Sequence, residues 1–346
     1  MGYVQADPIR APARAQDLIL RHRVNDYGEG DLERRYPKLD IEEDALHNYG
    51  FVHRDLQLLM HPRRMRRESR VELSHPGLLD RVREFVRPRV TIHPRDLDAD
   101  HGRQSVTNYW GGSSSATTHA LDWLHYGGEL RVLRRDAGIR VYAPARHHEG
   151  MPLAGESAGE RAVHLLERAV ALYAPMPRAS VRQLASMLRY GAPHLATMLM
   201  DRRLIERALD GGGLRVVVVD DIEWILPRAE RIRGDAGNRV RFLAPFDPVV
   251  WDRRRFEIFW GWSYRFEAYT PAAKRKLGYY ALPLLWRDFV IGWANVRAID
   301  DRLEAEIGFV EKRPRDAAFT RELDAELERF ARFMRTSRKL RITFRR

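Results

Sequence analysis

The chain has 346 residues, and its 60 Lys and Arg outnumber its 48 Asp and Glu to give a formal net charge of +12. A chain of this length is expected to form several modules, and a charge of this size favours a polyanionic partner. The sequence contains no cysteine, which excludes disulfides, thiolate catalysis and cysteine-ligated zinc or iron–sulfur clusters.

Two further features narrow the class of protein. No segment approaches the roughly 20 apolar residues that cross a bilayer, and no basic amphipathic helix stands out, so nucleic acid is favoured over lipid as the partner. The N-terminal residues have neither the charged nor the apolar region of a signal peptide. We therefore expect no membrane contact and a cytoplasmic, nucleoid-associated location.

Residues 1–85 are expected to be mainly helical. Helical segments are predicted at 11–23 and 41–49, with the glycine-containing loop 26–30 between them. This stretch fits a degenerate N-terminal winged-helix-like module.

Residues 86–150 carry the clearest predicted module. A short helix is followed by a second helix, which starts after the candidate N-caps Ser113–Ser115 and stops at Gly127. Two strands that alternate apolar and basic residues follow, at 130–133 and 139–142, around a turn at 136–138. Two helices followed by a hairpin are typical of a winged helix, the central one of this chain.

Residues 151–228 repeat that order and predict a third winged helix. Apolar residues at helical spacing predict a helix around 181–188, and a second helix is expected at 193–204. A hairpin is expected at 205–219, folding back around Gly211–Gly213. These glycines lack the Lys-Ser/Thr of a phosphate-binding loop, so they are interpreted as a turn.

The sequence after residue 228 differs in composition and pattern from the modules before it. Short aromatic-rich strands predict a small β-barrel or sheet domain at 229–310. A helix is expected at 316–334 within the last stretch, 311–346, followed by a mobile basic tail. The predicted fold class is therefore α+β, with tandem winged-helix modules, a small C-terminal β-barrel or sheet domain and a terminal helix.

The order of these parts resembles the AlkZ/YcaQ family of winged-helix DNA glycosylases over nearly the whole chain. Val4–Ile9, with its Gln-x-Asp motif, resembles the catalytic strand of the YcaQ branch, and Trp110–Leu130 is similar to the central winged helix. The C-terminal β-domain signature is the most specific part, and its segments are Pro245–Arg255, Tyr269–Arg275 and Gly278–Pro283.

The resemblance implies a DNA-repair glycosylase that excises N-alkylated purines, such as N7-alkylguanine, and unhooks interstrand crosslinks. It implies that the substrate is double-stranded DNA, lodged in a concave basic channel formed by three winged helices. We expect a monomer that needs no cofactor and no metal. Relatives carry a further helix before the catalytic strand, and this chain begins four residues ahead of Gln5.

The predicted catalytic residues are Gln5 and Asp7. Hydrolysis of an N-glycosidic bond passes through a cationic sugar, so a carboxylate that orients or deprotonates water is useful there. Pro8 favours an extended Asp7, and residues two apart in an extended chain project to the same side, so both side chains can face one ligand. The alternative is that both are polar residues on an exposed strand.

Two features bear on the chemistry that the site excludes. No lysine lies within thirty residues of the motif, which argues against a Schiff-base lyase step and for a monofunctional enzyme. His147 and His148 lie next to Glu149 in a Pro/Gly-flanked loop. Adjacent histidines point in different directions and no third ligand follows, so no metal site is predicted.

Candidate DNA-binding residues come from three places. His53 lies where relatives tend to carry a histidine, and a hydrogen-bonded structural role is the alternative. Phosphate contacts are expected from the arginine run at Arg63, Arg64, Arg66 and Arg67, and from the predicted wing at Arg131, Arg134, Arg135 and Arg140. Such a charge run can instead be a solvated face.

Two other classes of protein remain open from the sequence. Winged helices are more often found in transcriptional regulators than in enzymes, so a winged-helix DNA-binding protein without catalysis is the main alternative. A catalytically inactive relative that shields lesions is another. The Gln-x-Asp motif is the feature that separates an enzyme from both.

Overall fold

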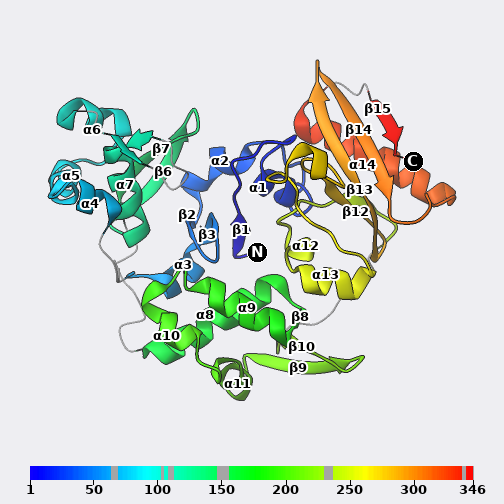
Figure 1. Ribbon diagram of the computed structural model, residues 1–346, viewed down its shortest axis with the longest axis horizontal. Helices are drawn as coiled ribbons and strands as arrows, with labels where there is room; N and C mark the ends of the chain where they lie inside the picture. Colours follow the sequence, from blue (N-terminus) through cyan, green and yellow to red (C-terminus); the bar gives the residue numbers. More distant parts are fainter. Residues whose placement is uncertain are drawn as a thin grey trace. The chain divides into compact units, whose positions relative to one another are not determined.

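The computed structural model of the chain describes residues 1–63, 69–102, 105–107, 113–145, 156–229, 237–336 and 340–345. It divides into two compact units, each assembled from segments that are distant in sequence (Figure 1). The first unit comprises Met1–Tyr3, Glu33–Arg168 and Gln183–Asp210, and the second comprises Val4–Leu32, Ala169–Arg182 and Gly211–Arg346. Four elements cross from one unit to the other: β1 (Tyr3–Gln5), α2 (Asp31–Arg35), α8 (Ala158–Tyr173) and α9 (Arg178–Leu188).

The first unit contains short helices and three small hairpins. Its elements in the first half are η1 (Tyr36–Lys38), β2 (Ile41–Ala45), β3 (Tyr49–His53), α3 (Arg54–Met60), α4 (Arg70–Ser74), α5 (Leu78–Val86) and α6 (Pro94–His101). Its remaining elements are β4 (Ser105–Thr107), β5 (Ser113–Ser115), α7 (Ala116–Gly127), β6 (Leu130–Asp136), β7 (Ile139–Pro144), η2 (Pro193–Leu195), α10 (Ala196–Leu199) and α11 (Leu204–Asp210).

The helix predicted at 41–49 is wrong, because β2 and β3 form an antiparallel hairpin there. The acidic side chains of Glu42, Glu43 and Asp44 on β2 are all buried. Each carboxylate pairs with an arginine from another element. Long-range ion pairs, which no local pattern reveals, therefore determine the conformation of this segment.

The predicted helix and hairpin in the middle of the chain are confirmed as α7 and β6–β7. Gly128 caps α7 in the left-handed conformation. The hairpin turns at Ala137 and Gly138, whose φ angles of 49° and 85° match the two-residue turn that suits twisted strands. The buried side chains of α5, α7 and the hairpin form one apolar core, which includes Val82, Leu121 and Tyr142.

A close backbone approach at Gly191 yields a stability prediction. A Cβ at this position would meet the carbonyl oxygen of Leu46, that of Ala45 at 2.6 Å and the Met60 sulfur at 2.8 Å. We expect Gly191→Ala to destabilise the protein by about 1–3 kcal/mol, as overpacking does. Gly127→Ala is the control, since nothing lies within 4 Å of its Cβ. Equal midpoints of thermal unfolding for the two variants would contradict the prediction.

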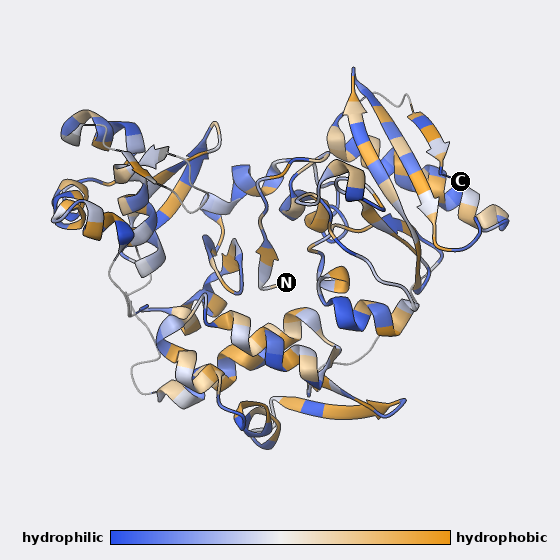
Figure 2. Cartoon of the chain, viewed as in Figure 1, coloured by the Kyte–Doolittle hydropathy of each residue, from blue (hydrophilic) through white to orange (hydrophobic). Residues whose placement is uncertain are grey.

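The second unit is built on an open five-stranded sheet. The strand order is β11 (Val240–Phe242), β12 (Leu282–Trp286), β13 (Phe289–Ile299), β14 (Arg302–Phe309) and β15 (Leu340–Phe344). Helix α14 (Ala317–Met334) packs on it, with rings 5.2 Å apart at Trp286 and Phe319 and 6.3 Å apart at Phe242 and Phe330. Figure 2 shows the alternating hydropathy along β13 and β14 that such one-sided packing requires.

The other elements of the second unit surround this sheet and helix. They are α1 (Ala15–Leu20), β8 (Met176–Pro177), β9 (Leu214–Val219), β10 (Ile222–Pro227), α12 (Pro248–Trp251), α13 (Arg253–Trp260) and η3 (Ala272–Lys274). Helix α1, from the start of the chain, lies beside the last helix, α14 (Figure 1), and the Arg21–Glu326 ion pair joins these two parts of the sequence.

The predicted small β-barrel or sheet is an open sheet in the described residues and not a barrel. Two other expectations for this part of the chain need correction. The tail is predicted to be mobile, but its described residues 340–345 are held in place, because β15 pairs in parallel with β14 and the Arg345 amide donates to the Ile307 carbonyl at 2.8 Å. The hairpin predicted around Gly211–Gly213 is instead β9–β10, which turns at Asp220 and Asp221 with left-handed φ angles.

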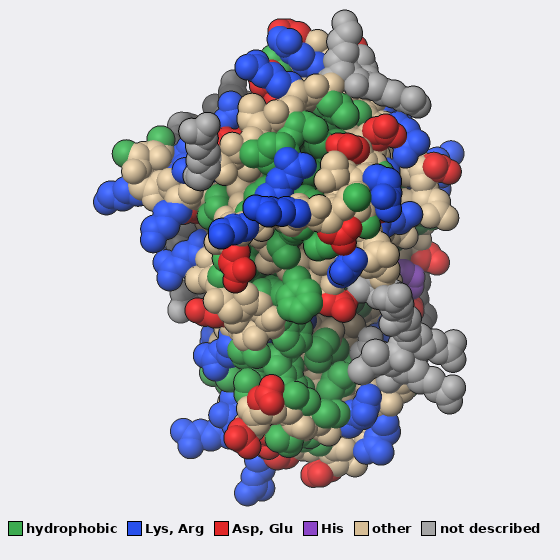
Figure 3. Space-filling model, turned by 90° about the vertical axis from the view of Figure 1, so that its right-hand side faces the viewer, with side chains coloured by type: hydrophobic (Ala, Val, Ile, Leu, Met, Phe, Trp, Pro, Cys, Tyr) green, Lys and Arg blue, Asp and Glu red, His purple; other side chains and the backbone are tan. Residues whose placement is uncertain are grey.

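Two surface properties of the described residues bear on partners. No helix among them is both long and apolar enough to cross a membrane. On the face shown in Figure 3, Lys and Arg side chains lie singly or in small groups among hydrophobic and acidic ones. On this face the positive charge therefore does not mark a single patch for DNA.

Candidate active site

The predicted catalytic pair lies at and just after the end of β1. Gln5 is 5% exposed and Asp7 is 9% exposed, so neither is a polar residue on an exposed strand. One Asp7 carboxylate oxygen accepts a hydrogen bond from the Ile9 amide at 2.8 Å. This local turn across Pro8 fixes the direction of the carboxylate.

The surroundings of Asp7 change the pKa of its carboxyl group. Burial raises the pKa of the Asp7 carboxyl above its ordinary value of 3.8, and the hydrogen bond from Ile9 opposes this only in part. The negative charge of Asp7 also contributes, after burial, to the raised pKa of Tyr280 and of Tyr269. Two tyrosines from the C-terminal half of the chain therefore lie within electrostatic reach of the carboxylate.

Tyr280 is the more informative of these tyrosines. Its side chain is buried, and its hydroxyl has no hydrogen-bond partner among the described residues. Its ring packs edge-on against Phe266 at a centroid distance of 5.0 Å. A buried hydroxyl without a partner is uncommon and costly, so the Tyr280 hydroxyl is a candidate to bind a ligand or water.

The loop before Tyr280 is held rigidly. The Glu267 carboxylate accepts hydrogen bonds from the amides of Lys276, Leu277 and Gly278, at 2.8–3.3 Å. These bonds hold the pKa of Glu267 below its ordinary range, although its burial opposes this. Residues 277–280 line a cavity of about 650 Å³ together with Arg10–Pro12, which follow the Gln-x-Asp motif in sequence.

Four of the arginines predicted to bind DNA pair with carboxylates on other elements. The nitrogen–oxygen distances are 2.7 Å for Arg63–Asp44, 2.8 Å for Arg131–Glu42, 2.6 Å for Arg135–Glu43 and 2.6 Å for Arg140–Asp122. The Arg63 side chain has no exposed surface. Three of these arginines neutralise the buried carboxylates of β2, which gives them a structural role within the first unit.

The other predicted DNA contacts are placed differently. Arg134 is 46% exposed and pairs with Asp136 at 2.9 Å. His53 caps α3 by accepting a hydrogen bond from the Asp55 amide at 3.3 Å, and 43% of its side chain is exposed. Arg64, Arg66 and Arg67 lie outside the described residues, as does the His147–Glu149 loop. In the part of the chain that is described, no three acidic or histidine side chains form a group that could hold a metal.

Sequence reasoning missed Tyr269 and Tyr280 as functional candidates. Both belong to segments that carry the family resemblance, but no chemical pattern singles out a tyrosine within them. Gln5 and Asp7 lie in the second unit, as these tyrosines do, whereas those predicted DNA-binding residues that the structure describes lie in the first.

Comparisons with known proteins agree with this architecture. The model of the family described as "DNA glycosylase AlkZ-like" matches residues 1–333. Among solved structures, the chain is similar to the Streptomyces sahachiroi DNA glycosylase AlkZ, with a TM-score of 0.59 and 14% sequence identity. The similarity covers 99% of this chain and 91% of that one. At this level of identity the likeness shows a shared fold.

Proposed function

From the membership of this chain in the AlkZ-like DNA glycosylase family, we propose that it hydrolyses the N-glycosidic bond of N-alkylated purines in double-stranded DNA. N7-alkylguanine is the proposed lesion, because alkylation at N7 makes the base a cationic leaving group. Interstrand crosslinks joined through the same purine position are proposed as further substrates.

The observation that carries the proposal is the buried, oriented carboxylate of Asp7 next to Gln5. In the proposed reaction the Asp7 carboxylate orients or deprotonates the attacking water and stabilises the sugar cation. Gln5 holds the water or the sugar. A strong general acid is not required, because the alkylated base leaves as a neutral molecule once the bond breaks.

We propose a monofunctional hydrolysis without a Schiff base. Lys274 and Lys276 lie in the loop between Tyr269 and Tyr280, so the proposal needs a direct test. Borohydride trapping on DNA that contains N7-methylguanine should give no covalent protein–DNA product. A trapped product would establish a lyase step instead.

The proposed DNA contacts rest on helix–hairpin modules. The packing of α6 and α7 with the β6–β7 hairpin in one apolar core supports a winged helix at 86–150, and α9 to α11 followed by β9–β10 support another at 151–228. Arg134 and His53 keep exposed surface and remain proposed contacts with DNA. The protein is proposed to act as a monomer.

The decisive experiment uses a duplex with one N7-methylguanine. Incubation with the protein should leave an abasic site, which alkali converts to a strand break at the lesion. A matched duplex with unmodified guanine should stay intact. Binding to both duplexes without an abasic product would contradict the proposal and favour a winged-helix regulator or an inactive relative.

The Tyr280 hydroxyl leads to a prediction about the same site. Tyr280→Phe keeps the ring contact with Phe266 but removes a buried hydroxyl that is free to bind water or the sugar, so we expect a loss of kcat of about tenfold or more. The melting temperature and the affinity for DNA should not change.

The control is Tyr264→Phe, because the Tyr264 hydroxyl is already bonded to the Ala281 carbonyl at 2.8 Å. This variant should lower the melting temperature while leaving kcat nearly unchanged. Tyr280 has no role in the reaction if its variant retains the full single-turnover rate.

A further inference from the structure

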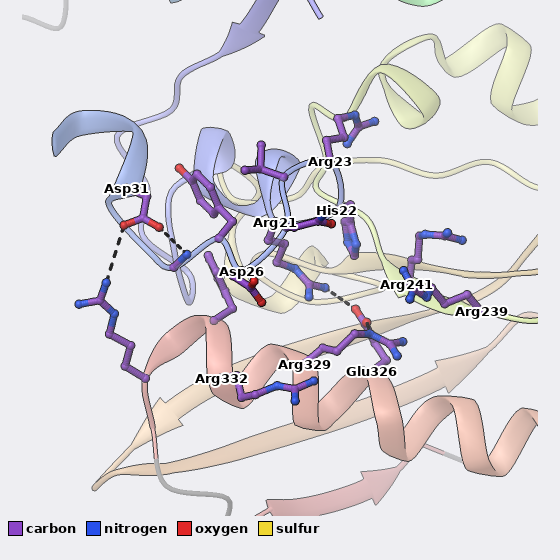
Figure 4. A pocket seen from close by; sticks show the side chains of 16 residues that line it. Arg21, His22, Arg23, Asp26, Asp31, Arg239, Arg241, Glu326, Arg329 and Arg332 are labelled. Carbon is purple, nitrogen blue, oxygen red and sulfur yellow. Dashed lines mark hydrogen bonds and ion pairs between the residues drawn. The ribbon is translucent and has the colours of Figure 1, made fainter. Parts of the chain in front are cut away.

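A second cavity of about 650 Å³ lies in the second unit, between the end of α1, the loop that follows it, β11 and α14 (Figure 4). Seven arginines and three acidic residues line it. The acidic residues are Asp26, Asp31 and Glu326. The proposed reaction at Asp7 assigns no role to this concentration of positive charge.

Part of the charge is neutralised at the base of the cavity. The fully buried Glu326 carboxylate pairs with Arg21 and with Arg329, the latter at 3.0 Å. Burial alone would raise the pKa of Glu326, but these two arginines hold it below its ordinary range. His22 donates to the Phe242 carbonyl at 2.8 Å, and burial lowers its pKa to about 4, so it adds no charge at neutral pH.

Two further arginines also have carboxylate partners. Arg23 forms a two-pronged pair with Asp247, with both distances at 2.8 Å. Arg335 lies 3.7 Å from Asp31 and is 65% exposed. These pairs hold the rim of the cavity in place.

Arg239, Arg241 and Arg332 differ from the other arginines of the cavity in their ion pairs. Within the described part of the chain, none of the three has a carboxylate partner. Burial, and then the like charge of Arg239, lower the pKa of Arg241; the charge of Glu326 opposes this in part, and the charges of Arg329 and Arg23 add to it. Figure 4 shows Arg239 and Arg241 side by side on one side of the cavity. An anion between these side chains would relieve their mutual repulsion.

We propose that this arginine pocket binds a phosphate group of the DNA backbone. The planar guanidinium binds phosphate through two parallel hydrogen bonds, which makes arginine the preferred residue for such a contact. The choice of DNA as the source of the phosphate rests on the proposed function. Asp7 and the pocket belong to the same unit, and α1 is the one helix between Asp7 and Arg21 in the sequence.

The test compares Arg239→Ala/Arg241→Ala with Arg315→Ala/Arg321→Ala. The control pair removes the same charge from exposed side chains outside the pocket. Affinity for an unmodified duplex is measured against salt concentration, and pyrophosphate binding is measured by calorimetry. The pocket variant should bind the duplex at least tenfold more weakly at low salt, and the slope of log K against log salt should fall by about one to two.

Three outcomes separate the sources of phosphate. A lowered slope in the pocket variant alone supports a backbone contact. Pyrophosphate binding that is lost in the pocket variant, with duplex affinity unchanged, overturns the DNA assignment in favour of a small phosphate-bearing ligand. No change in either measurement overturns the pocket as a phosphate site.

Unmodified DNA keeps this test separate from the proposed chemistry. If the protein does not excise N7-methylguanine while the pocket variant still shows a smaller slope of log K against log salt, the glycosylase proposal fails and the phosphate site stands. Neither double variant should unfold at a lower temperature than the wild type, because none of the four arginines forms an ion pair within the described residues.

Discussion

Asp7→Asn is expected to slow excision of N7-methylguanine by about 10²–10⁴-fold, the usual contribution of a positioned acid or base. The amide can still accept the hydrogen bond from the Ile9 backbone, so the turn across Pro8 is kept. It cannot accept a proton from water or carry the charge that stabilises the sugar cation. Single-turnover kinetics on the lesion-containing duplex measure the effect.

The pH profile provides a second signature of Asp7. Because burial raises its pKa above 3.8, the reactive ionised form is lost at a higher pH than for an exposed aspartate. The acidic limb of the rate profile should therefore lie above pH 3.8 and should be absent in the residual rate of Asp7→Asn. The folded state disfavours the charged form, so the substitution should not lower the melting temperature.

The exposed Asp324 of α14 offers a matched control for this substitution. Asp324→Asn should leave both rate and DNA affinity unchanged. Wild-type rates in Asp7→Asn, with the same acidic limb, would exclude Asp7 from the chemistry.

The second large effect is expected for stability. Arg63→Ala should destabilise the protein by about 3–5 kcal/mol, because it leaves the buried Asp44 carboxylate without its arginine. The lost guanidinium also donates to the carbonyls of Ala45 and Tyr126, each at 2.8 Å, and lies over the Tyr126 ring at 4.7 Å. Gln57 and His61 remain as hydrogen-bond donors to Asp44 but do not replace the fixed charge.

Urea unfolding at several pH values measures this effect. Burial alone would raise the pKa of Asp44, but Arg63 and His61 hold it well below 3.8. A carboxyl with a depressed folded pKa stabilises the fold above its unfolded pKa, and this stability is lost as the pH falls through the folded pKa. In Arg63→Ala the folded pKa rises, so the variant should lose stability at a higher pH than the wild type.

Arg134→Ala is the control for Arg63→Ala, since its half-exposed pair with Asp136 should contribute at most about 1 kcal/mol. A loss below that value for Arg63→Ala would show that the buried network does not hold the first unit together.

Helices and strands could be predicted from the sequence where their hydrophobic pattern and the residues that end them are both present locally. The β6–β7 hairpin has alternating strands and a glycine at the left-handed turn position, and α7 has a glycine stop. The β9–β10 turn was misplaced because three glycines precede it, while the actual turn uses Asp220 and Asp221. Aspartate tolerates the left-handed conformation at a modest cost. Two aspartates therefore indicate a turn less strongly than glycines do.

The arginines show the limit of charge patterns. Arg131 and Arg135 were predicted to contact DNA, yet their carboxylate partners lie 89 and 92 residues away in the sequence. A surplus of arginine predicts a polyanion, but it does not distinguish a guanidinium facing solvent from one that neutralises a buried acid. The Gln-x-Asp motif can be recognised from its resemblance to the family. Tyr269 and Tyr280 can be identified as its neighbours only from the three-dimensional structure.

The division of the chain into interleaved units has a consequence for protein synthesis. Residues 4–32 belong to the same unit as residues 211–346, so Asp7 leaves the ribosome long before Tyr280. At about 5–20 residues per second, the delay is roughly 15 to 50 s. Strand β1 can pair with β3 early, but the C-terminal surroundings of Asp7 can form only after this delay. A ribosome that stalls before the C-terminal sheet would release a fragment without the surroundings of Asp7.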